Sequence, residues 1–238
     1  DVLGELAART SMHATYAPAI SFDGGKYGIG VLSREKPLTC RHRALPGREE
    51  ARTLLIVEFE RYVVCCMHLS LTEEDRMRSL PIICDEAAKA RKPLFIAGDM
   101  NAQPGSAFMR ELQRHFRLLS RPDRPTYPAD KPRETIDYIA AHAADTARYV
   151  LLRTQVWDEP AASDHRPVTA DIVLLPGGEH QSAARPRRLS ARRTFFRNSS
   201  GSRCPTRPRP TRGCRGSSGW SFRCPSQSRS RAASPSRS

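Results

Sequence analysis

The sequence predicts an α/β domain in which a mixed sheet, or two packed sheets, carries helices on the outside. Strand-like apolar runs alternate with helix-like segments, and this alternation is typical of α/β folds. Other strand-like runs follow one another directly, so hairpins are also expected. The length of 238 residues is enough for one such domain or two small ones, and no internal repeat with a fixed period is visible.

Three segments have the signals of helices. Residues 2–12 carry apolar side chains at helical spacing. Residues 72–91 begin with a threonine and a run of acids, which is a common helix start, and Pro81 predicts either a kink or a later start. Residues 106–116 form the third helical segment, for which Ser106 is the expected N-cap.

Seven segments have the apolar pattern of strands. Two of them almost touch in the sequence, which predicts a tight hairpin near Glu60–Arg61. Residues 92–101 are mostly apolar until the last residues of the segment, as expected of a short buried strand. The expected strands are residues 27–35, 51–60, 61–70, 92–101, 135–142, 147–157 and 166–175.

The charge of the chain divides it into two regions. Residues 1–175 hold 24 Lys and Arg and 24 Asp and Glu, whereas residues 176–238 hold 15 Arg and one acid, Glu179. The formal charge of +14 therefore comes from the second region, as fifteen positive charges less one negative charge. A basic chain usually suggests a nucleic-acid partner, but here the charge says nothing about the first region.

The second region, residues 176–238, is rich in Arg, Ser, Pro and Gly and has no apolar periodicity, which predicts a disordered tail. Three explanations stay open for it: a nucleic-acid-binding tail, a solvated linker, or translated sequence from a shifted reading frame. The abrupt change of composition and the loss of Lys favour the last. Its three cysteines are ten residues apart and lack the close pairs of zinc sites.

The remaining cysteines suggest no disulfide framework, so a reducing compartment and a cytoplasmic location are expected. Cys65 and Cys66 are expected to be buried thiols on a strand. No stretch approaches the ~18–20 apolar residues of a transmembrane helix. No signal peptide is expected, and nothing in the sequence indicates an oligomeric state.

The run "LFIAGDMN" ends an apolar strand with Asp99 and Asn101. Side chains two residues apart on an extended chain point the same way, and ligand sites collect where strands of α/β folds end. A carboxylate with an amide oxygen suits Mg²⁺ or Mn²⁺. An Asx turn that merely ends the strand explains the same pair equally well.

Other polar residues interrupt or end strand-like runs. Asp164 and His165 precede a strand, and as neighbours on an extended chain they would address different partners, such as a metal and a substrate. His165 alone is more often an ordinary surface or core histidine. Asp137 lies inside an apolar run, where a carboxylate costs free energy unless it is paired, and His68 ends another run. Together the four residues suggest one site.

These motifs, taken in order, resemble the endonuclease/exonuclease/phosphatase family of DNase I-like metal-dependent phosphoesterases. The matching stretches are "YGIGVLSREKP", "GREEAR", "CCMHLS", "FIAGDMNAQP", "TIDYIA" and "SDHRPV". The resemblance as a whole covers roughly residues 1–175. "TYP" at residues 126–128 is similar to bacterial members, although a turn around prolines explains it too. The resemblance implies a four-layer sandwich of two mixed β-sheets flanked by helices.

The resemblance also implies a divalent-metal phosphoesterase and assigns roles to residues. Asp99 and Asn101 would bind the metal or the phosphate, and Asp164 would be a metal ligand. His165 would be the general base or acid, oriented by Asp137. His68 would be the second histidine of the site, with Glu50 as its carboxylate partner. The metal would be Mg²⁺ or Mn²⁺.

Two departures from the family pattern stand out. The family has an N-terminal strand with an Asn and a later strand that ends in Gln-Glu, and that Glu is its principal metal ligand; neither precedes Asp1. We therefore expect impaired activity of this chain. The second departure is the tail of residues 176–238, which the family does not need.

The substrate stays open between a nucleic acid, a phospholipid head group and an inositol phosphate. Two alternatives to a phosphodiesterase or phosphatase remain: a DNA endonuclease or exonuclease of the same fold, and a non-catalytic nucleic-acid-binding fragment that acts through the tail. The neutral first region argues against a duplex-binding nuclease, because duplex binding usually needs a basic face.

Overall fold

The computed structural model describes residues 1–176. Apart from Pro176, the tail predicted to be disordered lies outside the described residues. The predicted boundary between residues 175 and 176 is therefore described on its N-terminal side only. Within the described part, no helix is both long enough and apolar enough to cross a membrane.

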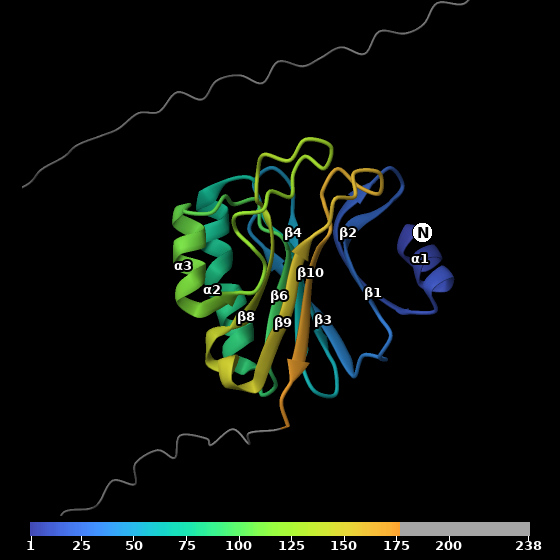
Figure 1. Cartoon of the computed structure of the whole chain (residues 1–238). Coiled ribbons are helices and arrows are strands. Elements are labelled where there is room, and N and C mark those ends of the chain that lie inside the picture. Colours follow the sequence, from blue (N-terminus) through green and yellow to red (C-terminus); the bar gives the residue numbers. More distant parts are fainter. Residues whose placement is uncertain (177–238) are drawn as a thin grey trace, which may run out of the picture. The chain divides into compact units, whose positions relative to one another are not determined.

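A six-stranded mixed sheet forms the centre of the fold (Figure 1). The strand order is β3-β4-β5-β6-β8-β7, and only the β5–β6 pair is parallel. The parallel pair requires a crossover, which α2 provides between the two strands. The bounds are β3 Thr39–Leu45, β4 Arg52–Glu58, β5 Val63–His68, β6 Leu94–Asp99, β7 Phe116–Leu118 and β8 Asp137–His142.

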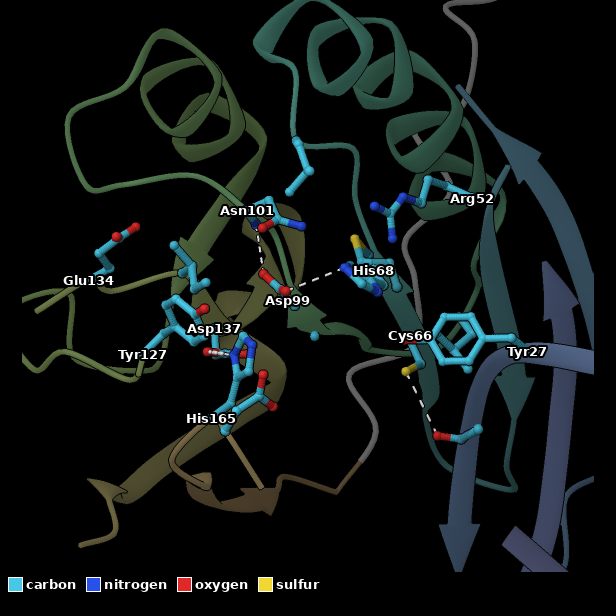
Figure 2. A pocket seen from close by; sticks show the side chains of 17 residues that line it. Tyr27, Arg52, Cys66, His68, Asp99, Asn101, Tyr127, Glu134, Asp137 and His165 are labelled. Atoms are coloured by element: carbon cyan, nitrogen blue, oxygen red, sulfur yellow. Dashed lines mark hydrogen bonds and ion pairs between the residues drawn. The ribbon is translucent and has the colours of Figure 1, made fainter. Parts of the chain in front are cut away.

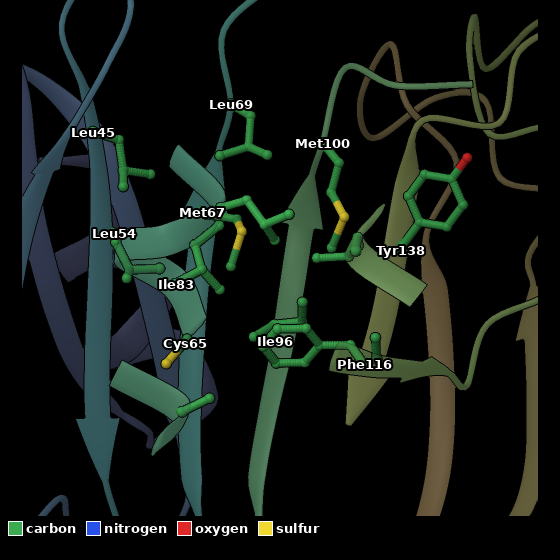
Figure 3. Packing of buried hydrophobic residues seen from close by; sticks show 14 of the residues in the cluster. Leu45, Leu54, Cys65, Met67, Leu69, Ile83, Ile96, Met100, Phe116 and Tyr138 are labelled. Carbon is green, nitrogen blue, oxygen red and sulfur yellow. The ribbon is translucent and has the colours of Figure 1, made fainter. Parts of the chain in front are cut away.

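Two helices, α2 (Glu73–Lys89) and α3 (Ala107–His115), cover one face of this sheet. Figure 3 shows the apolar core between them and the strands, with Ile83 of α2 close to the side chains of the sheet. The expected cap of α3 is confirmed, because the hydroxyl oxygen of Ser106 accepts a hydrogen bond from the backbone N–H of Met109. Pro81 lies inside a continuous α2, so the later start considered for this helix is wrong.

The opposite face of the sheet carries two antiparallel hairpins. One pairs β1 (His13–Phe22) with β2 (Gly25–Ser33), and the other pairs β9 (Tyr149–Val156) with β10 (Val168–Leu174). The first hairpin packs on a cluster that includes Leu55, Val57 and Phe59. The second packs on a separate cluster that includes Phe95 and Ala141.

The second layer therefore differs from the single mixed sheet that the resemblance implied. Among residues 1–176 no strand hydrogen-bonds β2 to β10, so the layer consists of two separate hairpins. The helix α1 (Val2–Thr10) contacts the outer side of the first hairpin and completes four layers: helices, sheet, hairpins and helix. The α/β class and the layered, DNase I-like arrangement are confirmed. The second sheet is not continuous, because its two hairpins are not hydrogen-bonded to each other.

Several elements were not predicted from the sequence. They are β1, which contains Pro18 and a register shift, β3, which is exposed except at Leu45, the three-residue β7, and a 3₁₀ helix at Ala143–Arg148. Each lacks a clean apolar pattern because it lies at an edge or on the surface. Of the two thiols expected to be buried, Cys65 is buried and Cys66 is half-buried; neither forms a disulfide.

Candidate active site

Three polar residues lie side by side at one edge of the six-stranded sheet. In the strand registers, His68 of β5 is opposite Asp99 of β6, and Asp99 is opposite Asp137 of β8. Each of these residues is at the end or the start of its strand. Sheet pairing therefore brings together three side chains that are far apart in the sequence.

Gly98 makes this row possible because it lets β6 approach β5 closely. Its φ is 143°, a conformation that L side chains rarely adopt, and a Cβ placed there would lie 1.9 Å from the carbonyl oxygen of Met67. On the other side of Asp99, Met100 is fully buried in the core. The glycine and the buried methionine together fix the position of Asp99 at the sheet edge.

Asp99 uses its two carboxylate oxygens differently (Figure 2). Oδ1 accepts a hydrogen bond of 2.8 Å from the backbone N–H of Asn101, which is an Asx turn, and Asn101 has a positive φ of 47°. Oδ2 lies 3.4 Å from Nε2 of His68. The amide of Asn101 donates to the carbonyl of Leu69 at 2.9 Å. Asp99 and Asn101 line the same cleft. The Asx turn considered for this motif is therefore present, and it leaves Oδ2 of Asp99 facing His68.

His165 and Asp137 form a hydrogen-bonded pair beside Asp99. Nδ1 of His165 lies 2.8 Å from Oδ2 of Asp137, as shown by the dashed line in Figure 2. The ring of Tyr127 lies against that of His165, with 4.8 Å between the centroids. The expectation that Asp137 orients His165 agrees with this contact.

The partner expected for His68 is wrong. Glu50 lies 2.7 Å from Nη1 of Arg52, and the carboxylate at ion-pair distance from His68 is Asp99. Arg52 is buried and also pairs with Glu49 at 3.1 Å. Because an arginine is a permanent charge with several donors, it holds Glu50 more strongly than a largely neutral histidine does.

The environment shifts the pKa values of the site residues in different directions. Burial raises the pKa of Asp99 to about 6, and the charge of Asp137 adds to the rise although the Asn101 N–H opposes it. Burial and the charge of Arg52 lower the pKa of His68. Burial also acts to lower the pKa of His165, but the hydrogen bond and the charge of Asp137 outweigh it and raise this pKa.

The row forms the floor of a cleft with a volume of about 740 Å³. Tyr27 from the first hairpin and Tyr127 from the loop before β8 stand on its walls (Figure 2). The volume is in the range of pockets that hold small molecules, ~300–1,000 Å³. Tyr27, Tyr127 and Glu134 were not among the predicted site residues. Tyr27 lies on β2 and Glu134 in the loop before β8, and neither position carries a local signal of a site. Tyr127 belongs to the "TYP" stretch, which a turn around prolines explained as well.

The donors in the cleft fit a divalent cation. Asp99, Asp137 and His165 each offer an atom within 4.8 Å of the others. Two carboxylates that face one another are the hard, negative ligands that Mg²⁺ or Mn²⁺ prefers, and such a cation would relieve their repulsion. Among the described residues this group does not include Asp164, which lines the same cleft and is more exposed.

The cleft thus brings together six of the seven predicted residues. His68, Asp99, Asn101, Asp137, Asp164 and His165 all line it. Glu50 lies beside it, next to Arg52 and His68, and lines a small neighbouring pocket. Their individual roles in metal binding and proton transfer stay predictions.

Comparison with solved structures shows the same fold in proteins of different activities. A mannosyl-6-phosphatase from Bacteroides thetaiotaomicron is 13% identical, with 72% of this chain and 81% of that chain covered and a TM-score of 0.58. The human Nocturnin catalytic domain with bound sulfate is 18% identical, with 74% and 77% covered and a TM-score of 0.58. A 3′ phosphatase from Neisseria bound to a product DNA hairpin is 18% identical, with 70% and 81% covered and a TM-score of 0.56.

At these identities the likeness concerns the fold alone. No curated protein matches the chain. The sequence of residues 3–165, however, matches the endonuclease/exonuclease/phosphatase family over most of the chain. With the sheet, the cleft and the paired motifs in place, the chain belongs to the endonuclease/exonuclease/phosphatase family.

Proposed function

We propose that this protein is a divalent-metal-dependent phosphoesterase, a phosphatase or phosphodiesterase that uses His165 to move a proton. The observation that carries the proposal is the His165–Asp137 pair beside Asp99 on the floor of the cleft. Hydrolysis of a phosphate ester needs a group that accepts a proton from the attacking water and a positive charge near the phosphate oxygens. The cleft offers residues for both needs.

His165 is the proton-transfer group in this proposal. Its Nδ1 is engaged by Asp137, so Nε2 is the ring atom that exchanges a proton with water or with the leaving oxygen. Asp137 stabilises the imidazolium that forms when the ring accepts the proton. His68, whose pKa is lowered, stays neutral near pH 7 and serves as a hydrogen-bonding partner for a phosphate oxygen.

A metal ion would be held at Asp99, with Asn101 and Asp164 as further oxygen ligands and Asp137 and His165 close by. A bound Mg²⁺ or Mn²⁺ would neutralise the phosphate oxygens and the negative charge that develops on them. Asp99 belongs both to the ligand set predicted from sequence and to the group of donors within 4.8 Å, so it is the ligand on which the site depends.

The charges around the cleft favour a small ester over duplex DNA. The carboxylates that line it are Asp99, Glu134, Asp137 and Asp164. The arginine in the lining, Arg52, is already paired with Glu49 and Glu50. Duplex binding depends on basic side chains that can contact phosphates. The ion pairs of Arg52 leave it little capacity for such contacts.

A nuclease that acts on single strands is the second candidate. Tyr27 is 49% exposed in the cleft wall, and Tyr127 also lines the cleft. Exposed aromatic side chains can stack on unpaired bases. Such an enzyme would cleave a single-stranded oligonucleotide faster than bis-p-nitrophenyl phosphate, and it would lose that preference in Tyr27→Ala.

The test is hydrolysis of p-nitrophenyl phosphate, bis-p-nitrophenyl phosphate and plasmid DNA by the full chain with Mg²⁺ or Mn²⁺. We expect metal-dependent turnover of a small ester that falls about 10²–10⁴-fold in His165→Ala. His115→Ala is the matched control, because His115 is an exposed histidine at the end of α3 outside the cleft, and its activity should equal wild type. Equal loss in both variants, or turnover that EDTA leaves intact, would contradict the proposal.

A further inference from the structure

We propose that Thr126 is a positioning residue that fixes the carboxylate of Asp137 and, through it, the ring of His165. This proposal rests on the role of His165 in the proposed function. Thr126 lies in the loop before β8 and is fully buried. Thr126 does not itself line the cleft, and the shortest hydrogen bond of its hydroxyl goes to Asp137, so we expect its side chain to act on the reaction through Asp137.

The hydroxyl of Thr126 is held so that its proton points at Asp137. Its oxygen is 3.3 Å from each of the backbone N–H groups of Ile136 and Asp137, which donate to it. The hydroxyl in turn donates to Oδ2 of Asp137 at 2.6 Å. The other acceptor in reach, the carbonyl of Glu134, is 3.5 Å away, so the shorter bond to the carboxylate takes the single proton.

The same oxygen of Asp137 also receives the hydrogen bond of His165. Oδ2 is 2.6 Å from the threonine hydroxyl and 2.8 Å from Nδ1 of the histidine. The terminal torsion of an aspartate has a broad, two-fold preference and does not choose one oxygen by itself. The bond from Thr126 supplies that choice, and it leaves the carboxylate as an acceptor for a protonated Nδ1.

The backbone of Thr126 ties the same residues together a second time. Its N–H donates to the carbonyl of Glu134 at 2.7 Å, and its carbonyl accepts from the N–H of Arg166, the residue after His165, also at 2.7 Å. The threonine therefore joins the start of β8 to the segment that carries His165. Because these bonds involve only the backbone, a change of side chain can remove the hydroxyl while the loop stays anchored.

A merely structural role is the competing explanation, since the hydroxyl also satisfies two buried backbone N–H groups. Thr126→Val keeps the shape of the side chain and removes the hydroxyl, whereas Thr126→Ser keeps the hydroxyl. Both explanations expect lower stability in Thr126→Val. If Thr126 positions Asp137, Thr126→Val should also change the tautomer of His165, and Thr126→Ser should keep the wild-type tautomer. A merely structural role predicts neither result.

The experiment measures the ring nitrogens of His165 by ¹⁵N NMR in the metal-free full chain, together with kcat and KM on a small ester in the presence of metal. We expect wild type and Thr126→Ser to carry the proton on Nδ1. In Thr126→Val the ring should populate both tautomers, and kcat should fall ~10–100-fold while KM stays within about twofold. Thr135→Val is the matched control, because Thr135 is a buried threonine in the same segment whose hydroxyl does not bond Asp137, and both readouts should match wild type.

The outcomes separate this proposal from the proposed function. A Thr126→Val variant with wild-type tautomer and kcat overturns the positioning role. If Thr126→Val does not fold, Thr126→Ser decides, and loss of the Nδ1 proton in that folded variant overturns it equally. If the wild-type chain hydrolyses no ester but Thr126→Val still shifts the tautomer of His165, the positioning of the ring stands and the proposed function fails.

Discussion

Asp99 shows how one residue can serve the fold and the site together. Its Oδ1 closes an Asx turn with Asn101, while Oδ2 faces His68 across two neighbouring strands. The turn restrains the carboxylate at the place where burial and Asp137 raise its pKa. Burial of two facing carboxylates is unfavourable without a counter-charge, which is a reason to expect a cation there.

Asp99→Asn should therefore weaken metal binding while leaving the fold intact. We expect the affinity for Mn²⁺ measured by isothermal titration calorimetry to fall by about tenfold or more, since a negatively charged ligand is lost. The unfolding free energy without metal should not fall, because the change removes a buried charge that faces another carboxylate. Asp123→Asn, an exposed change, serves as the control and should leave Mn²⁺ binding unaltered. Unchanged Mn²⁺ affinity in Asp99→Asn would contradict the assignment.

The close approach at Gly98 makes a second prediction about a single residue. Gly98→Ala would place a Cβ 1.9 Å from the backbone oxygen of Met67, so β5 and β6 would have to separate. We expect a loss of unfolding free energy of about 3 kcal/mol or more, measured by urea denaturation. Gly105 also has a positive φ, 82°, but nothing lies within 4 Å of its Cβ position, so Gly105→Ala should cost only ~1 kcal/mol. Equal losses at the two positions would show that strain in φ alone, and not the clash, determines the cost.

At the scale of elements, the loop between β3 and β4 is attached to the segment after β5 through Glu49. One carboxylate oxygen accepts from the N–H of Leu71 at 2.8 Å and lies 3.1 Å from Arg52, and the other accepts from the hydroxyl of Ser70 at 2.9 Å. These bonds hold Arg52 and its partner Glu50 beside the cleft. The site therefore depends on a loop whose sequence contains few apolar residues.

Glu49→Gln should weaken the fold in a pH-dependent way. Burial acts to raise the pKa of Glu49, but the Leu71 N–H, the Ser70 hydroxyl and Arg52 together lower it to about 2. Because the folded-state pKa is below the unfolded-state value, the stabilisation is fully present above pH ~4.5 and is lost as the pH falls toward 2. We expect the variant to be less stable by ~1–2 kcal/mol at pH 7, with the difference shrinking below pH 5 in urea denaturation.

The control for this prediction is Glu74→Gln. Glu74 forms ion pairs with Arg48 and Arg78, but its side chain is 57% exposed. Exposed ion pairs contribute little, so the change should be within ~0.5 kcal/mol at any pH. A Glu49→Gln difference that persists unchanged at pH 3 would mean that the carboxylate's charge is not what stabilises the loop.

At the scale of the whole molecule, the net positive charge and the predicted site residues lie in different parts of the chain. Residues 1–175 contain equal numbers of basic and acidic residues, and all predicted site residues fall within them. The excess positive charge lies in the Arg-rich sequence that follows. Nucleic-acid binding and ester hydrolysis should for this reason be separable properties of the protein.

Deletion of residues 177–238 should remove non-specific DNA binding and leave hydrolysis unaltered. We expect the full chain to bind duplex DNA with an affinity that falls steeply with salt, as measured by fluorescence anisotropy, because its arginines release counterions from the phosphates. The shortened chain should bind more weakly by about tenfold or more at low salt, with its kcat/KM on a small ester within about twofold of the full chain. DNA binding that survives the deletion would place the nucleic-acid surface on residues 1–176 and favour the nuclease candidate.

The sequence by itself determined the elements whose signals are local. The apolar runs of β4, β5 and β6, the start of α2 and the Ser106 cap of α3 are all in the positions expected, because apolar periodicity and capping depend on neighbouring residues. The motif residues identified the cleft for a similar reason. Polar side chains that interrupt or end buried strands need a partner or a ligand, and six of the seven predicted residues line one cavity.

Only the tertiary structure decided which of these residues face one another. The register of β5, β6 and β8 pairs His68 with Asp99 rather than with Glu50, and it sets Asp137 beside Asp99. The segment before β10 brings His165 to the same place, where it bonds Asp137. The hydrogen bond of Thr126 to Asp137 and the division of the second layer into two hairpins also appear only in three dimensions. Registers and loop contacts join segments that are distant along the chain, and no local pattern encodes the energy of such contacts.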